Sequence, residues 1–420
     1  MSKINTNLNE LIQRVYKKQF ESSSNVYFGG IPILFAGDFY QLPPVQGHPV
    51  LIYDDLYCWQ TGVNVFLELK TSHRFTDDPK WSNIMSRMRC DEGMDEADVI
   101  QINSRVVGSK DGPSTKEIPS DVNYATCTNH DRVAVNEGVF IQHLKRNHPT
   151  DSNADIPKTG VVILPSKLEL HHGRDKDGKH AYKSPSQLVS DVIQSYCGEA
   201  HFRCSNGSKC YPIMLKLFHG CPMMLIDNTD VENSKANGSY GKFVGMKLKN
   251  NKSWDDLEVM EISNHYVRCV CVDDVESIQM KLMDSEDEKI VDIFAETHKG
   301  QLAFPNFALP RKRNSDYHRL HRAFRCCQFP VNIAIARTVH KLQGRTLSSL
   351  HVVTWRHASN WVHVVLSRVR TLNGLFLAKP LEGSKVKPIS YELRHYLQRM
   401  RTLIPVEKSN VVEVNLNDDV

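Results

Sequence analysis

The sequence has 420 residues, of which 40% are hydrophobic and 24% charged, and its formal net charge is +4. This length allows two or three domains with sizeable cores, and the composition is ordinary for a globular protein. Because 52 basic residues nearly balance 48 acidic ones, charge alone does not indicate a nucleic-acid-binding protein.

The eleven cysteines are scattered and odd in number, which favours reduced thiols in an intracellular compartment over a disulfide framework. The polar start of the chain does not resemble a signal peptide. No apolar run approaches the length of a membrane span, so we expect a soluble protein without a membrane partner.

The first informative stretch lies near the start of the chain. An amphipathic helix is predicted over residues 4–20, followed by a buried strand of a parallel sheet over residues 31–36. The strand leads into the string Phe35-Ala-Gly-Asp-Phe-Tyr-Gln-Leu-Pro-Pro-Val45. Gln41 follows the carboxyl end of the strand, where open α/β sheets bind ligands. A plain surface turn is the alternative interpretation.

An arginine follows the next predicted strand, residues 66–69. Arg74 precedes a helix that carries Trp81, Ile84 and Met85 at helical spacing. An arginine in this place is either a solvated charge or a phosphate ligand, because a guanidinium matches phosphate geometry.

A strand and helix are predicted from Tyr124 to Asn136, with Thr128 or Asn129 capping the helix. Residues 145–187 are polar and predict an insertion or a mobile loop.

Four residues form a candidate zinc cluster: Cys197, His201, Cys204 and Cys210. Zinc needs four such ligands in tetrahedral geometry, but their spacing matches no common structural pattern. The sequence therefore leaves zinc binding open, and we predict no metal on this basis.

Short antiparallel strands with Asn-Gly turns are predicted over residues 211–248, and a further strand over residues 266–272. Residues 310–325 are the most basic segment of the chain. Basic side chains interleaved with aromatic ones suit a phosphate backbone and stacked bases, although a solvated basic face is an equal alternative.

The second informative stretch covers residues 329–347, in which a predicted strand ends in polar side chains before Gln343-Gly344 turns the chain. Those polar residues are Thr338, His340 and Lys341. A donor-rich turn at the end of a strand suits contacts with phosphate and sugar. The string Val365-Leu-Ser-Arg368 follows, before the apolar run at residues 374–377.

Three of these strings resemble motifs of the petite-integration-frequency (Pif) and RecD-like helicases. The string that ends at Val45 resembles the third motif, residues 329–347 resemble the fifth, and the string around Arg368 resembles the sixth. The segment around Arg74 resembles the fourth motif. The fifth motif departs from the family at Leu342, where a small serine is more typical, and the sixth begins with valine in place of alanine.

The resemblance implies an α/β fold of RecA-like motor domains with an inserted small β-barrel. It implies four parts. They are the end of the first RecA-like domain (1–62), the second RecA-like domain (63–205 and 326–400, with the polar insertion at 145–187), the inserted barrel and basic segment (206–325), and a flexible tail (401–420).

The resemblance also implies the roles of single residues. Gln41 would sense the terminal phosphate of ATP, Arg74 would contact it, and Arg368 would be the arginine finger. These three would be catalytic, and Gly344 would join them in binding the nucleotide. The DNA backbone would be gripped by Thr338, His340 and Lys341.

The implied function is ATP-driven 5′-to-3′ unwinding of DNA in repair, recombination or telomere and genome maintenance. Single-stranded DNA and duplex junctions would be the partners of a monomer in the nucleus, with the mitochondrion as an alternative location.

ATP and Mg²⁺ are the implied cofactors, yet the groups that hold them in this family are absent from the sequence. No glycine-rich loop ends in Gly-Lys-Ser/Thr, because the two Gly-Lys pairs are followed by His180 and Phe243. No Asp-Glu pair precedes Met1-Ser2, which falls about where the family has a Ser-Met. The chain therefore resembles a family member cut inside its second motif, which would need upstream residues to hold both cofactors.

Two alternatives stay open. The first is a nucleic-acid-binding fragment that hydrolyses nothing, because phosphate-sensing residues and an arginine finger cannot replace the residues of a phosphate loop. The second is the helicase segment of a transposon protein.

Overall fold

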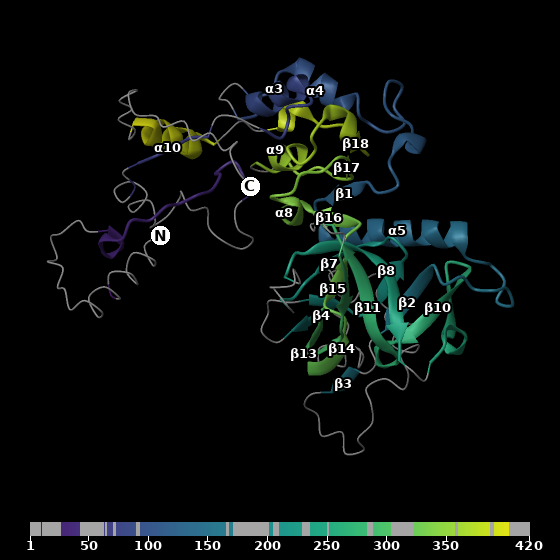
Figure 1. Ribbon diagram of the computed structural model, residues 1–420. Helices are drawn as coiled ribbons and strands as arrows, with labels where there is room; N and C mark the ends of the chain where they lie inside the picture. The colour runs from purple at the N-terminus through teal and green to yellow at the C-terminus, as the bar shows by residue number, and fades with distance from the viewer. Residues whose placement is uncertain are drawn as a thin grey trace, which may run out of the picture. The chain divides into compact units, whose positions relative to one another are not determined.

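In the computed structural model the chain forms two compact units (Figure 1). The first unit comprises Met1–Ile118, Leu342–Leu350 and Trp355–Val420, and the second comprises Pro119–Lys341 and His351–Thr354. The structure describes residues 10, 27–42, 63, 65–69, 73–89, 93–164, 168–170, 201–204, 210–228, 236–249, 252–283, 289–303, 323–357, 360–386 and 390–402. Among these residues, no helix is both long and apolar enough to cross a membrane.

The second unit consists of β-strands and one long helix. Its elements are β1 (Asn123–Thr126), α5 (Asn129–Asn147), β2 (Gly160–Leu164), β3 (Leu168–Leu170), β4 (His201–Cys204), β5 (Cys210–Pro212), β6 (Leu215–Phe218), β7 (Pro222–Leu225), β8 (Tyr240–Leu248), η3 (Trp254–Asp256), β9 (Glu258–Ile262), β10 (His265–Cys271), η4 (Val272–Asp274), β11 (Val275–Leu282), β12 (Ile290–Ile293), β13 (Glu296–Ala303), β14 (Ala323–Gln328), β15 (Val331–Ile333) and β16 (Ala336–Thr338). Two elements contain a boundary between the units, α8 (Val339–Leu342) and β17 (Leu350–Val352).

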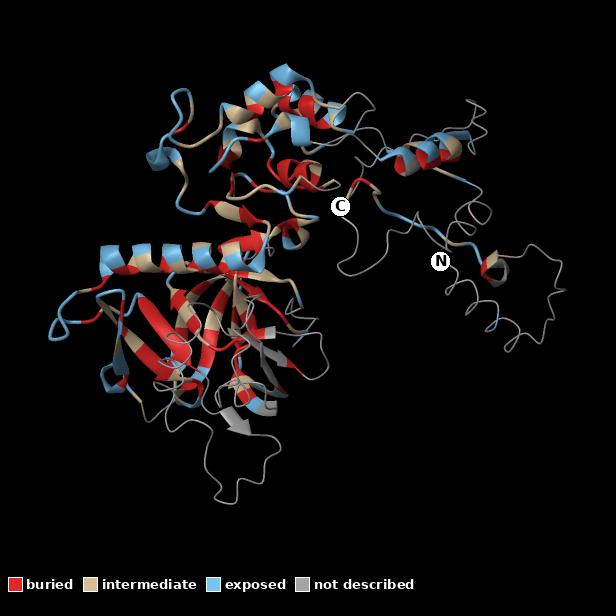
Figure 2. Cartoon of the chain, turned by 180° about the vertical axis from the view of Figure 1, so that it is seen from behind, coloured by how far each residue is buried: buried red, intermediate tan, exposed pale blue. Residues whose placement is uncertain are grey.

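The strand and helix predicted from residue 124 onward are confirmed as β1 and α5. β1 pairs in parallel with β16, and its other side receives a hydrogen bond of 3.0 Å from the N–H of Val353 to the carbonyl of Ala125. Thr128 caps α5 as predicted, because its hydroxyl accepts the N–H of Asp131 at 3.1 Å. The helix turns Phe140 and Leu144 toward the strands, while its opposite side is exposed (Figure 2).

Two sheets of the second unit share one hydrophobic core. Their strand orders are β6-β2-β10-β9 and β12-β11-β8-β7-β15. Alternate residues of β6 are buried, and Leu215, Leu217, Met223 and Leu225 belong to the same cluster as side chains of β8 and β11. The antiparallel strands predicted over residues 211–248 are therefore confirmed as β6, β7 and β8, and the later strand is confirmed as β10.

A third sheet has the order β3-β14-β13-β4-β5, and all its neighbouring pairs are antiparallel. The basic segment at 310–325 lies outside the described residues except for its last three, which begin β14. The barrel was predicted within residues 206–325, but strands before residue 206 and after residue 325 belong to the same three sheets. A separate small β-barrel with these bounds therefore stays a prediction.

The structure corrects part of the insertion or mobile loop predicted over residues 145–187, of which residues 165–167 and 171–187 lie outside the described residues. Residues Gly160–Leu164 form β2, whose five residues are all buried and which pairs in parallel with β10 and antiparallel with β6. The polar flanks hid this short run of Gly, Val, Ile and Leu, which is typical of a strand buried on both faces.

The first unit is mainly helical among its described residues. Its elements are η1 (Tyr27–Gly30), α3 (Pro79–Arg87), α4 (Glu96–Asn103), η2 (Thr115–Glu117), α9 (Trp361–Leu366), η5 (Leu372–Gly374), β18 (Leu375–Leu377), η6 (Gly383–Lys385) and α10 (Tyr391–Thr402). The helix predicted after Arg74 is confirmed as α3, whose buried residues are Trp81, Ile84 and Met85. Trp81 anchors it, because its indole N–H donates to the carbonyl of Val369 at 3.2 Å.

Two predicted strands of the first unit are absent, which corrects the sequence analysis. Residues 31–36 and 66–69 have no regular secondary structure, and Leu34, Leu67 and Leu69 are 90%, 77% and 94% exposed. A parallel strand is stable only when neighbours satisfy its backbone and cover its side chains, and no described strand pairs with either segment. The helix predicted at 4–20 lies outside the described residues except for Glu10, as does the tail after residue 402.

Removing the cap of α5 should loosen its first turn. We expect Thr128→Ala to lower the free energy of local opening by about 1 kcal/mol, because the N–H of Asp131 loses its acceptor. Native-state hydrogen exchange of the first-turn amides measures this change. Thr128→Ser is the matched control and should keep the protection, whereas equal loss in both variants would contradict the capping role.

Candidate functional site

The turn that carries Gln41 is fixed by its own backbone. The carboxylate of Asp38 accepts the N–H of Tyr40 at 2.9 Å, and the N–H of Gln41 donates to the carbonyl of Asp38 at 3.1 Å. An aspartate that accepts a backbone N–H two residues on is typical of a tight turn. The side chain of Gln41 therefore leaves the chain in a defined direction.

Aromatic side chains attach this turn to the rest of the first unit. Tyr40 is buried in a cluster with residues of α10, and the ring of Phe39 lies edge-on to Tyr396 at 5.2 Å. The hydroxyl of Tyr40 donates to the carbonyl of Arg89 at 3.2 Å, and the Arg89 guanidinium lies 4.2 Å from the Tyr40 ring centroid. Arg89 also lies 3.3 Å from the carboxylate of Asp38. The turn is thus held by packing and by charge.

Gln41 contacts the turn that follows α8. Its side-chain oxygen accepts a hydrogen bond of 2.7 Å from the amide nitrogen of Gln343. The next residue, Gly344, has a φ of +85°, a conformation that glycine adopts without strain. The third and fifth motif-like strings therefore meet through a pair of amides.

Arg74 joins two further segments of the first unit. Its Nε donates to the hydroxyl of Thr346 at 3.0 Å, and its Nη1 donates to the carbonyl of Ser367 at 2.8 Å. The side chain is half-buried, and burial lowers the pKa of Arg74. The Arg74 side chain is therefore held against Ser367, a residue of the sixth motif-like string. This contact excludes the interpretation that Arg74 is a freely solvated charge.

Arg368 is 5% exposed, although it carries a full charge. Its Nε donates to the carbonyl of Val364 at 2.9 Å, and its Nη2 donates to the hydroxyl of Ser367 at 2.9 Å. Burial, together with the charge of Arg74, lowers the pKa of Arg368 to about 10, while the carboxylate of Asp38 opposes this change. Arg368 stays cationic at neutral pH because this value lies far above 7.

Two guanidinium groups lie close together in this part of the first unit, which makes it positively charged. Their described partners are mainly carbonyl and hydroxyl oxygens, which satisfy N–H groups without neutralising charge. Guanidinium groups bind phosphate oxygens through paired N–H donors. The arrangement is therefore suited chemically to a polyphosphate.

The predicted DNA-contacting residues belong to the second unit. Thr338 ends β16, and His340 and Lys341 follow in α8. Lys341 is exposed, and the other two are half-buried. The structure thus brings Arg74 and Arg368 together and links Gln41 to the residue before Gly344. The three residues predicted to contact DNA follow one another along one short segment of the second unit.

Four residues that hold this site together were not predicted from the sequence. They are Asp38, Gln343, Thr346 and Ser367. Each lies inside a string already singled out, so a search for polar side chains in those strings would have found them. A buried arginine of the second unit, Arg337, was also not predicted from the sequence. It contacts Asn123, and its guanidinium lies 4.3 Å from the Tyr240 ring centroid.

The candidate zinc cluster is only partly described. Cys204 is buried in β4, whereas Cys197 and the side chains of His201 and Cys210 lie outside the described part of the chain. Zinc binding by these four residues therefore stays open.

No family model matches the sequence. Over 87% of its length the chain is 24% identical to the ATP-dependent DNA helicase PIF1 of Homo sapiens, and it covers 42% of that protein. Over 94% of its length it is 21% identical to the uncharacterized protein 030L of Invertebrate iridescent virus 6, and it covers 74% of that protein. A stretch of 74 residues is 35% identical to PIF1 of Saccharomyces cerevisiae, which is 9% of the yeast protein. The chain thus spans less than half of each curated helicase that it matches.

Solved structures of Pif1 helicases share the fold. The crystal structure of Pif1 helicase from Candida albicans superimposes with a TM-score of 0.55 and 19% identity, over 94% of this chain and 73% of that one. Pif1 helicase from Bacteroides in complex with ADP-AlF3 and ssDNA gives a TM-score of 0.53 and 16% identity, over 94% and 72%. The chain therefore has a RecA-like, Pif1-type helicase fold, and the resemblance found in its motifs is confirmed.

A double-mutant cycle tests the contact between the two glutamines. We expect Gln41→Ala and Gln343→Ala to show a coupling energy of about 0.5–1.5 kcal/mol in urea unfolding, because each single change already removes the shared hydrogen bond. Gln41→Ala combined with Arg370→Ala, an exposed residue, is the control and should be additive. A coupling energy of zero for the glutamine pair would mean that the two amides do not interact.

Proposed function

We propose that this chain, which has a Pif1-type fold, supplies the nucleotide-sensing and DNA-gripping parts of an ATP-dependent DNA helicase that moves 5′ to 3′. The observation that carries the proposal is the meeting of Arg74 and Arg368 at Ser367. Two cations held together in a half-buried place need an anionic ligand, and ATP supplies one with several negative oxygens.

In this proposal the two arginines act on the terminal phosphate of ATP. Arg74 is already ordered by Thr346 and by the carbonyl of Ser367, so it contributes a preorganised donor. Arg368 donates to Val364 and Ser367, and these bonds are exchanged for phosphate oxygens when nucleotide binds. A finger of this kind stabilises the negative charge that develops during phosphoryl transfer.

Gln41 links nucleotide to DNA in this scheme. Its partner Gln343 lies in the turn after α8, and α8 carries His340 and Lys341. A change in the hydrogen bonds of Gln41 on ATP binding or hydrolysis is therefore passed to the segment that grips DNA. Thr338, His340 and Lys341 contact the DNA backbone and carry no sequence information.

The residues of this site fit a polyphosphate but not a magnesium ion. Mg²⁺ is held by carboxylates, and the described carboxylate beside the arginines, Asp38, is engaged by Arg89 and by the N–H of Tyr40. Hydrolysis therefore needs a magnesium-binding acid outside this group of residues, and a Gly-Lys-Ser/Thr phosphate loop, which the 420 residues do not contain.

The proposed partners are single-stranded DNA and duplex junctions, bound by one copy of the chain. Structures with similar folds contain Bacteroides Pif1 bound to ssDNA, and another concerns unwinding of forked dsDNA by two coordinating Pif1 helicases. We further propose a role in DNA repair, recombination or telomere and genome maintenance in the nucleus, with the mitochondrion as the alternative location.

A second candidate is a nucleic-acid-binding protein without hydrolysis, and the lack of a Gly-Lys-Ser/Thr string favours it. An ATPase assay of the 420-residue chain with single-stranded DNA separates the candidates. We expect no turnover by the chain alone and turnover when a phosphate loop and magnesium acid are joined to it. Failure of the joined protein to hydrolyse ATP would favour the non-hydrolysing binder.

Arg368 should be essential in that joined protein. We expect Arg368→Ala to reduce DNA-stimulated ATP turnover by about 10³-fold or more while leaving DNA affinity unchanged, because the finger acts only on the developing charge. Arg370→Ala, an exposed arginine of the same segment, is the control and should keep full turnover. Unchanged turnover in Arg368→Ala would remove the finger assignment.

Lys341 should contribute one phosphate contact. We expect Lys341→Ala to weaken binding of single-stranded DNA equally for different sequences, and to reduce the slope of log affinity against log salt by about 1. Fluorescence anisotropy across a salt series measures both quantities. The control is Lys379→Ala, which removes an exposed lysine elsewhere in the chain. Equal slopes for the two variants would exclude Lys341 from the DNA contact.

A further inference from the structure

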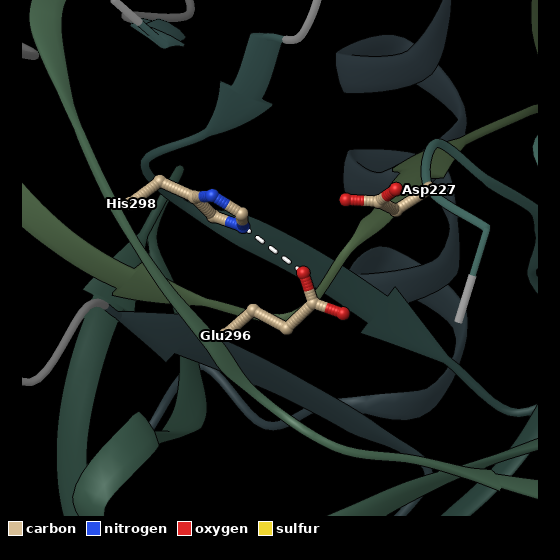
Figure 3. A group of neighbouring side chains, drawn as sticks. All are labelled: Asp227, Glu296 and His298. Atoms are coloured by element: carbon tan, nitrogen blue, oxygen red, sulfur yellow. Dashed lines mark hydrogen bonds and ion pairs between the residues drawn. The ribbon is translucent and has the colours of Figure 1, made fainter.

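A second cluster of ionisable side chains lies where two sheets of the second unit adjoin. Asp227 follows β7, while Glu296 and His298 both lie on β13 (Figure 3). One ligand atom of each residue, two carboxylate oxygens and an imidazole nitrogen, lies within 4.8 Å of both others. Neither the DNA-helicase proposal nor the sequence motifs use these residues.

The backbone explains how the three side chains meet. Glu296 and His298 are two residues apart on a strand, so they project from the same face. The N–H of Ile226 donates to the carbonyl of Pro330 at 3.0 Å, which attaches the end of β7 to the segment after β14, the neighbour of β13. Asp227 is the next residue and thereby reaches the face of β13.

Tyr211 of β5 holds the side chains of Asp227 and His298 in place. It is 1% exposed, and its ring stacks on the imidazole of His298 with centroids 4.6 Å apart. Its hydroxyl donates to the carboxylate of Asp227 at 3.2 Å and lies 2.7 Å from Nε2 of His298. A buried phenol with two polar partners fixes the orientation of both side chains.

Nε2 of His298 is the centre of this arrangement. It lies 3.0 Å from a carboxylate oxygen of Glu296 as well as 2.7 Å from the hydroxyl of Tyr211. One imidazole N–H thus serves two oxygens, while the carboxylate of Asp227 accepts hydrogen bonds from the phenol and from the N–H of Asn228 at 2.7 Å. A divalent cation can accept lone pairs from two carboxylates and an imidazole at once, which a shared proton cannot do.

We propose that Asp227, Glu296 and His298 bind one divalent transition-metal ion, with Tyr211 as a hydrogen-bonded partner outside the coordination shell. Two carboxylates and an imidazole suit Mn²⁺, Fe²⁺ or Zn²⁺. On binding, Nε2 releases its proton to solvent and donates its lone pair to the metal. The Glu296 and His298 side chains are 32% and 24% exposed, so an ion enters from water and keeps water as its remaining ligands.

Such an ion would tie the end of β7 to β13 and so connect two of the sheets in the second unit. Its site is distinct from the arginine pair, which belongs to the first unit and fits an anion. A nucleotide is therefore not needed for binding.

The test is to titrate Mn²⁺ into the EDTA-treated 420-residue chain without nucleotide. Binding is measured as the loss of the free Mn²⁺ signal in electron paramagnetic resonance. Mn²⁺ is the probe because the eleven cysteines would compete for Zn²⁺. We expect one equivalent to bind, with at least about ten-fold weaker affinity in Asp227→Asn and in Glu296→Gln, and a smaller loss in Tyr211→Phe.

Asp292→Asn is the matched control, because Asp292 is a carboxylate of the same unit that pairs with Lys247 at 2.7 Å. It should bind Mn²⁺ as the unaltered chain does. Equal affinities in all four variants, or the lack of any bound equivalent in the unaltered chain, would overturn the proposal.

A second measurement needs no variant and so does not depend on folding of the substituted proteins. Sub-stoichiometric Mn²⁺ should broaden the ring signals of His298 in a histidine-labelled chain before those of the other eighteen histidines, since the chain has 19 in total. Preferential broadening of other histidines would place the bound ion elsewhere and overturn the assignment.

Discussion

The burial of Arg368 is the constraint on which the candidate site depends. A guanidinium removed from water must keep its N–H groups hydrogen-bonded, and here the carbonyls of Val364 and Arg345 and the hydroxyl of Ser367 serve that purpose. None of these groups carries charge, so the positive potential of Arg368 persists and is reinforced by Arg74. Like charges held together cost stability, and such arrangements are characteristic of sites that await a ligand of opposite charge.

The amide pair of Gln41 and Gln343 gives this site its connection to the rest of the chain. A neutral amide both donates and accepts, so it can exchange partners without creating or burying a charge. The turn that carries Gln41 is itself held by Asp38 and by the packing of Tyr40 against α10. A signal from a bound nucleotide would therefore start from a rigid support and act on one exchangeable hydrogen bond.

The second unit rests on a different interaction, the hydrophobic core shared by two of its sheets. Side chains of β2, β6, β8 and β11 interdigitate there, and burial of apolar area is the dominant favourable contribution to such a fold. This core leaves the polar cluster around Tyr211 to be satisfied locally, by Asp227 and His298. Charge concentrated beside a rigid apolar core is well placed to hold an ion, because the surrounding strands keep the ligands in position.

The sequence by itself determined what depends on neighbouring residues. The periodicity of Trp81, Ile84 and Met85 defines α3, Thr128 defines the start of α5, and the motif strings identify the fold because each is a local pattern. The tertiary structure decided what depends on distant residues. Residues 31–36 look like a buried strand but remain exposed coil, since a strand needs partners that no local pattern supplies. Likewise, the contact of Gln41 with Gln343 and the approach of Asp227 to His298 join segments far apart in the chain, and only the folded backbone brings them together.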